Sequence, residues 1–275
     1  MLNKYENIHT TFEKIDEINL TSLTPFILTV NWDNVKYEFL IRANSSSNEL
    51  LVFGSGAYDP AKMKPPIFQR HSWTEHFDSN MIYYNDPTLY LGQMSLGWGH
   101  GNDDTFFLEK ISKIIGKLMT KMTVKAEDTL FYGSSGGGFM SMILAGYIKG
   151  SKALVNNPQT IIPNYYQTHV NRLLEAAHPS LPTEESAKKY ITRLNVLEFF
   201  KEINYMPYIF YLQNTACDHD VVKHFMPFVR GLNTLKDTLT YNRLTVEMYS
   251  NKEQGHNPLE LEDTIYYINK VKNKK

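Results

Sequence analysis

The sequence has a single cysteine, Cys217, among its 275 residues, and it carries little net charge. One cysteine excludes an intramolecular disulfide and a cysteine metal cluster, and we expect no metal site. A formal net charge of −1 gives no electrostatic basis for binding nucleic acid or an anionic membrane. Residues 1–20 hold no apolar stretch of signal-peptide length, and no later window approaches a membrane span. These features predict a cytoplasmic protein with neither a transmembrane segment nor a nucleic-acid partner.

Internal repeats, low-complexity tracts and Pro/Ser-rich linkers are also missing, so residues 1–275 are predicted to form one domain. Residues 25–43 read as two antiparallel strands around a turn at 31–34, and strands then alternate with helices. This alternation predicts right-handed crossovers and an α/β fold with a mostly parallel sheet flanked by helices. The later predicted strands are 49–53, 81–84, 129–132, 153–155, 208–212 and 244–248, and the helices are 105–122, 136–149, 221–235 and 258–272.

Residues 161–204 interrupt the alternation. They carry two helical patterns, around 165–177 and 183–200, with a Pro-containing stretch between them. An insertion at this point of an α/β chain lies above the carboxyl ends of the strands. We therefore predict a helical cap or lid.

The sequence Gly133-Ser134-Ser135-Gly136-Gly137 matches the pattern G-x-S-x-G between a predicted strand and a predicted helix. In this pattern the serine occupies a strained turn, and a Cβ at either flanking position would clash with neighbouring backbone. The alternative is a glycine-rich helix start that binds phosphate, but no lysine follows the glycines as it does in a P-loop. We predict that Ser135 is a nucleophile and that the α/β fold is an α/β-hydrolase fold.

A serine needs a histidine to take its proton and an acid to orient that histidine. His256 is the last histidine of the chain and lies between the last predicted strand and the last helix, where this fold places its base. The acid should follow the preceding strand, and both Asp218 and Asp220 qualify. We favour Asp218, because the apolar Val221 three residues later commonly anchors the loop after this acid.

Two backbone N–H groups should stabilise the oxyanion of the reaction. One belongs to Gly136, and the other is expected in the loop after strand 49–53, at Ser55 or Gly56. Four further residues are predicted to line the substrate pocket, although each would serve equally well in packing. They are Arg70, Trp98, His100 and, in the turn 156–159, Asn157.

Over about residues 50–260 the chain resembles α/β-hydrolase-fold proteins of bacterial surface-polysaccharide machinery. These include capsule O-acetyltransferases and the acetyltransferase component of accessory secretion. The resembling stretches are 52–56, 85–87, 132–137, 156–159, the segment with Gln213, Asn214, Asp218 and His224, and Gly255-His256.

The resemblance implies that Ser135, Asp218 and His256 form a catalytic triad that moves an acetyl group onto or off a sugar hydroxyl. It implies acetyl-CoA as an acyl donor with no bound cofactor, and a carbohydrate or small acyl ester as substrate. A lipase, thioesterase or peptidase of the same fold remains an alternative, as does a non-catalytic carbohydrate-binding or scaffold protein. The sequence leaves the oligomeric state open, a homo-oligomer included.

Overall fold

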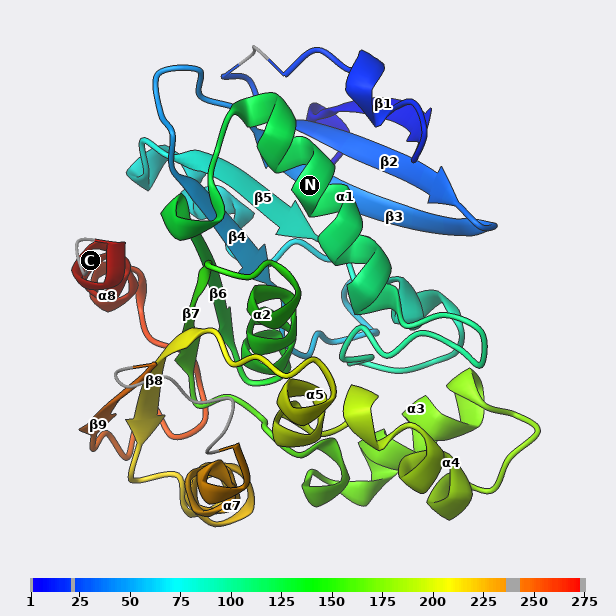
Figure 1. Ribbon diagram of the computed structural model, residues 1–275, viewed down its shortest axis with the longest axis vertical. Coiled ribbons are helices and arrows are strands. Elements are labelled where there is room, and N and C mark those ends of the chain that lie inside the picture. Colours follow the sequence, from blue (N-terminus) through cyan, green and yellow to red (C-terminus); the bar gives the residue numbers. More distant parts are fainter. Residues whose placement is uncertain (1, 21–22, 236–242, 273–275) are drawn as a thin grey trace.

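The computed structural model describes residues 2–20, 23–235 and 243–272 (Figure 1). Within these ranges nine strands form one sheet in the order β1-β2-β3-β5-β4-β6-β7-β8-β9. The pairs β2–β3 and β3–β5 are antiparallel and the others are parallel, which confirms a mostly parallel sheet with an antiparallel hairpin near its start. The helices in these ranges lack the length and apolar character needed to cross a bilayer. The cytoplasmic location and self-association stay predictions.

The strands are β1 (Glu6–Thr11), β2 (Phe26–Trp32), β3 (Val35–Arg42), β4 (Leu50–Gly54), β5 (Asn80–Tyr84), β6 (Thr129–Ser134), β7 (Lys152–Asn156), β8 (Tyr208–Asn214) and β9 (Leu244–Tyr249). The helices are α1 (Phe107–Met122), α2 (Gly136–Tyr147), α3 (Gln167–Ala177), α4 (Thr183–Lys189), α5 (Val196–Glu202), α6 (Asp218–Asp220), α7 (Met226–Gly231) and α8 (Leu261–Lys272).

The central strands are buried on both faces of the sheet (Figure 1). In β6, Leu130 and Tyr132 pack in the same apolar cluster as Ile268 of α8, whereas Phe131 packs in the cluster that contains Phe139 of α2. Successive side chains of a strand point to opposite faces, so a strand covered on both sides is apolar throughout. This explains why the predicted core strands read as continuous apolar runs.

The structure departs from the predicted elements in three places. β1 is absent from the predictions because its sequence is mostly polar, and it pairs with β2 at the edge of the sheet. The helix predicted over 183–200 is divided into α4 and α5, because the Asn195 side chain caps α5 by accepting a hydrogen bond from Leu197 N at 3.0 Å. The helix predicted over 221–235 begins with α6 and a π-helical turn, Val221–Phe225.

Residues 161–204 contain α3, α4 and α5, and the buried rings of His178 and Tyr190 join them to the loop after β5. His178 Nε2 lies 2.8 Å from His100 Nε2, its Nδ1 lies 2.8 Å from Asp103 Oδ1, and its ring stacks on Tyr190 at 3.9 Å between centroids. Burial lowers the pKa of both histidines, which favours neutral rings. His178 Nδ1–H then donates to Asp103, and His178 Nε2 accepts a hydrogen bond from His100. Figure 1 shows α3 and α4 at the periphery beside α5. A role as a lid stays a prediction.

A sharp turn at Ser135 joins β6 to α2. Its backbone angles, φ 55° and ψ −126°, lie outside the regions that residues with side chains ordinarily occupy. A Cβ on Gly133 would lie 2.2 Å from the Gly137 carbonyl carbon and oxygen, and a Cβ on Gly137 would lie 2.6 Å from Gly54 O. The glycines on both sides of Ser135 therefore let the start of α2 approach β6 and β4 closely, as the motif predicts.

We predict that Gly133→Ala lowers the free energy of unfolding by about 3 kcal/mol or more, because the new methyl group meets backbone that cannot move independently. Gly116→Ala is the matched control: Gly116 lies within α1, and a Cβ there would have open space. Removing a helix glycine should leave stability unchanged or raise it by about 1 kcal/mol. Urea unfolding of both variants measures the difference, and equal stabilities would contradict the tight turn.

Candidate active site

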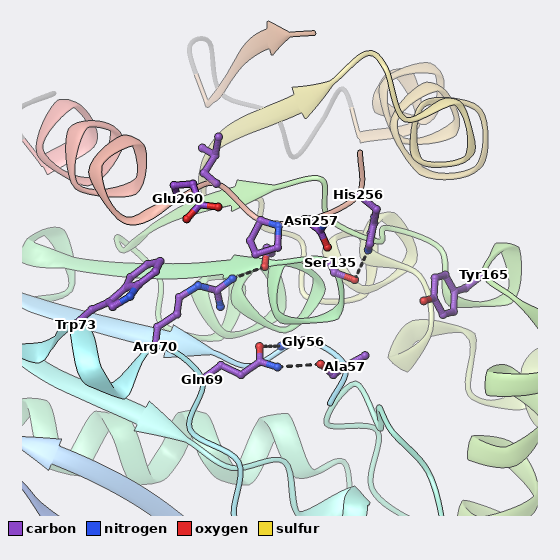
Figure 2. A pocket seen from close by; sticks show the side chains of 13 residues that line it. Gly56, Ala57, Gln69, Arg70, Trp73, Ser135, Tyr165, His256, Asn257 and Glu260 are labelled. Carbon is purple, nitrogen blue, oxygen red and sulfur yellow. Dashed lines mark hydrogen bonds between the residues drawn. The ribbon is translucent and has the colours of Figure 1, made fainter. Parts of the chain in front are cut away.

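Three side chains from distant parts of the chain meet above the carboxyl ends of β6 and β8. His256 Nε2 lies 2.9 Å from Ser135 Oγ (Figure 2). His256 Nδ1 lies 2.5 Å from Asp220 Oδ2. In a neutral imidazole, Nδ1–H then donates to the carboxylate and Nε2 accepts the hydrogen bond of the serine hydroxyl. This arrangement would let the imidazole take the serine proton while Asp220 holds the ring.

The acid that contacts His256 is Asp220, so the preference for Asp218 was wrong. Asp218 is the first residue of α6 and is exposed, whereas only 1% of Asp220 is accessible. Asp220, His224 and Phe228 are spaced four residues apart and all three are buried, so they lie on the inner face of this helical segment. The signal that could have found Asp220 is this spacing, rather than the apolar Val221.

The Asp220 carboxylate is kept ionised by its partners. Burial raises its pKa, but the hydrogen bonds from His256 and Cys217 together with the charge of His256 outweigh burial, and the pKa is lowered overall. Burial, and then the hydrogen bond to Asp220, raise the pKa of the Cys217 thiol to about 11. Ligand atoms of Cys217, Asp220 and His256 lie within 4.8 Å of one another, so these three residues could also approach a metal ion. The absence of a metal site stays a prediction.

The loop that carries His256 is fixed by side chains from the ends of two strands. At the end of β8, Asn214 Nδ2 donates to Asn251 O at 2.7 Å and to Gly255 O at 2.8 Å. At the end of β7, Asn156 Oδ1 accepts a hydrogen bond from Leu259 N at 3.0 Å. Both asparagines are fully buried, so their amides form hydrogen bonds with this loop in place of water.

A cavity of about 570 Å³ opens at Ser135 and His256. Of the four residues predicted to contact substrate, Arg70 lines this cavity (Figure 2). Trp98, His100 and Asn157 are fully buried and do not line it, which corrects that prediction. The glycine-rich loop turns the Trp98 and His100 rings inward, and Asn157 Oδ1 accepts a hydrogen bond from Asn214 N at 2.7 Å.

The predicted oxyanion donors lie beside Ser135, but one of them is engaged. Gly136 is the first residue of α2, where helix N–H groups have no partner within the helix. Gly56 N donates to Gln69 Oε1 at 2.9 Å, and Gln69 Nε2 donates to Ala57 O at 2.8 Å (Figure 2). The Ser55 hydroxyl donates to Ile67 O at 3.1 Å. Gly56 therefore needs the Gln69 amide to turn away before it can hold an oxyanion, and the second donor stays a prediction.

Gln159 is a site residue that sequence reasoning located only as part of a turn. Its Nε2 donates to Ser135 Oγ at 3.2 Å, and its Oε1 accepts a hydrogen bond from the indole of Trp98. The buried Trp98 thus fixes which end of the amide faces the serine. Ser135 Oγ therefore accepts a hydrogen bond from this amide, while its own hydroxyl proton faces His256 Nε2.

No protein-family model and no curated protein sequence matches this chain. Solved structures do match it. The capsule O-acetyltransferase of Neisseria meningitidis serogroup A is 14% identical with a TM-score of 0.67, and the match covers 100% of both chains. A mutant of that enzyme in complex with CoA matches with a TM-score of 0.68, 14% identity, and 99% of this chain against 100% of the other.

Two other similar structures come from different proteins. The glycosylation-associated Gap123 complex of Streptococcus agalactiae is 12% identical with a TM-score of 0.62, over 90% of this chain and 47% of that one. An S-formylglutathione hydrolase of Agrobacterium tumefaciens is 10% identical with a TM-score of 0.57, over 92% and 93%. Likeness at such low identity establishes the fold alone. The chain has the α/β-hydrolase fold.

Proposed function

We propose that this protein transfers an acyl group through an acyl-enzyme on Ser135, and that the group is an acetyl moved onto or off a carbohydrate hydroxyl. The observation that carries the proposal is the hydrogen-bonded series Ser135–His256–Asp220 at the wall of an open cavity. Nucleophile, base and orienting acid are the parts that acyl transfer by serine requires.

In the proposed reaction, His256 Nε2 takes the proton of Ser135 as its oxygen attacks an ester or thioester carbonyl. The carbonyl oxygen gains negative charge, which the Gly136 N–H and the start of α2 stabilise. The tetrahedral intermediate collapses, the leaving alcohol or thiol takes the proton from His256, and an acyl-serine remains. Water or a sugar hydroxyl then gives its proton to His256 and attacks the acyl-serine carbonyl. The second tetrahedral intermediate collapses with cleavage of the acyl–Oγ bond, and Ser135 Oγ takes the proton back from His256.

The wall of the cavity supports a carbohydrate substrate. Trp73 and Tyr165 lie on different sides of it, and Tyr165 comes from the insertion 161–204 (Figure 2). Aromatic rings with polar edges suit the apolar faces of a sugar ring. The similar capsule O-acetyltransferase, solved as a mutant with CoA, supports acetyl-CoA as the acyl donor. We extend this to a place in surface-polysaccharide or capsule modification.

We predict that a serine-directed fluorophosphonate adds covalently to Ser135, as detected by mass spectrometry of the intact protein and its peptides. Ser135→Ala should give no adduct and should lower kcat for p-nitrophenyl acetate by about 10⁴-fold or more. His256→Ala should lower kcat to a similar extent while its circular dichroism spectrum stays that of the unchanged protein. An absent adduct on a folded protein would favour a non-catalytic binding protein.

The two neighbouring aspartates provide a matched pair. Asp220→Asn should lower kcat by about 10³- to 10⁴-fold, because an amide cannot accept the Nδ1 proton with the strength of a carboxylate. Asp218→Asn makes the same chemical change two residues away, on an exposed side chain, and should change kcat by less than about twofold. Equal losses in the two variants, or a larger loss in Asp218→Asn, would contradict the role of Asp220.

Transfer and hydrolysis are separated by the effect of an acceptor. With acetyl-CoA as donor, we expect an oligosaccharide acceptor to raise the rate of CoA release by about tenfold or more and to become acetylated, because the hydroxyl competes with water for the acyl-serine. CoA release is followed with a thiol reagent and acetylated sugar by mass spectrometry. CoA release that no acceptor accelerates, with free acetate as the product, would identify an esterase.

A further inference from the structure

The guanidinium of Arg70 forms part of the cavity wall beside the proposed nucleophile (Figure 2). Its Nη2 donates to Ser134 Oγ at 2.7 Å, and Ser134 directly precedes Ser135. The rings of Tyr132 and Trp73 have their centroids 5.4 and 5.5 Å from the guanidinium carbon, within the range in which aromatic faces attract a cation. These contacts hold a positive charge at a defined place next to the reacting serine.

The other terminal nitrogen, Nη1, is buried and has no hydrogen-bond partner within the part of the chain that the structure describes. Arg70 takes part in none of the ion pairs found among the described residues. Other half-buried arginines satisfy the equivalent atom: Nη1 donates to Asn102 O from Arg193 and to Tyr205 OH from Arg243. A charged donor withdrawn from water without a partner is unfavourable, so Arg70 is set apart from these residues.

The backbone at Arg70 is held in a conformation that residues with side chains seldom adopt, with φ 64° and ψ 13°. It directly follows Gln69, whose side chain bonds both Gly56 and Ala57 at the cavity. Strained residues of this kind gather at sites where a side chain must be presented in one direction. The strain, the unpaired Nη1 and the cavity position are three separate observations on one residue.

We propose that Arg70 binds an anionic group of the substrate, a phosphate or a carboxylate, while Ser135 acts on the acyl group. This inference rests on the proposed function of Ser135. A small shift of the Arg70 side chain would bring the N–H groups of Nη1, which the structure withdraws from water, into contact with oxygen atoms of the anion. The anion would then pair a cation that has no acidic partner among the described residues. Glu260 lines the same cavity without pairing with Arg70, so the anion is expected on the Arg70 side, away from that carboxylate.

The anion has two chemical sources, and the geometry fits both. It could belong to the acyl donor, as the phosphates of acetyl-CoA do, or to the acyl acceptor, as a uronate or a sugar phosphate does. Calorimetric titration separates these sources without turnover. CoA is compared with pantetheine, which lacks the phosphates, and glucuronic acid is compared with glucose. In the pair that carries the natural anion, the unchanged protein should prefer the charged member, and Arg70→Met should remove that preference; the other pair should show no preference that depends on Arg70.

A kinetic test uses two acetyl esters that differ in one charge, 4-acetoxybenzoate and its methyl ester. The ratio of kcat/KM for the anionic ester to that for the neutral ester should fall by about 10- to 100-fold in Arg70→Met, the usual effect of one charge-assisted hydrogen bond. A merely structural role would lower kcat/KM for both esters alike and leave the ratio unchanged. Arg193→Met, which removes a half-buried arginine outside the cavity lining, is the matched control and should also leave the ratio unchanged.

Arg70→Lys serves if the methionine variant does not fold, because lysine keeps the charge but cannot present the planar donors of arginine; it should lower the ratio to an intermediate value. An unchanged ratio together with unchanged binding preferences in both titrations would overturn the proposal. A failure of the acyl-enzyme proposal gives a different result: neither ester is cleaved and no fluorophosphonate adduct forms, while the titrations still report whether Arg70 binds anions.

Discussion

The site depends on holding the His256 loop still against a serine that belongs to a different part of the sheet. The loop follows the edge strand β9 and has little secondary structure of its own, so its place is set by the buried amides of Asn214 and Asn156. Those amides sit at the ends of two adjacent parallel strands. These bonds keep the imidazole 2.9 Å from the hydroxyl, the distance that the proposed proton transfer from Ser135 to His256 would require.

The same strand ends also place the serine. Ser135 N donates to Asn156 O at 3.1 Å, and Asn157 N donates to Leu212 O at 2.9 Å, so backbone hydrogen bonds continue from β6 to β7 and β8 beyond the last paired residues. Parallel pairing brings carboxyl ends to one edge of the sheet, and the side-chain amides of Asn156, Asn157 and Asn214 there all bond to neighbouring segments. These bonds make the edge rigid, because moving one of the amides would leave its buried partner unpaired.

This dependence explains how much of the site the sequence could reveal. Ser135 and His256 were predictable because each has a distinctive sequence context. Ser135 stands between glycines, which are needed where two stretches of backbone approach closely, and His256 lies just before the last helix. Asp220 was not chosen over Asp218, because the prediction relied on the apolar Val221 and not on the four-residue spacing of Asp220 from the buried His224. The prediction that Trp98 and His100 line the substrate pocket was wrong for a related reason. Glycines around an aromatic residue indicate an unusual backbone, but they do not say whether the ring turns toward the cavity or, as here, toward the core.

The exposure of the site bears on what an acyl-enzyme here would do next. The His256 side chain is 38% accessible and the cavity is open, so water would reach the imidazole whenever the acceptor position is empty. Hydrolysis and transfer would share every catalytic group, and the balance between them would follow from how long an acceptor stays in the cavity and displaces that water. Tyr165, Trp73 and Arg70 form the part of the wall that can retain an acceptor or donor without taking part in proton transfer. Under the proposed function, the choice between an esterase and a transferase would therefore lie in these wall residues, while Ser135, His256 and Asp220 would set the rate that both outcomes share.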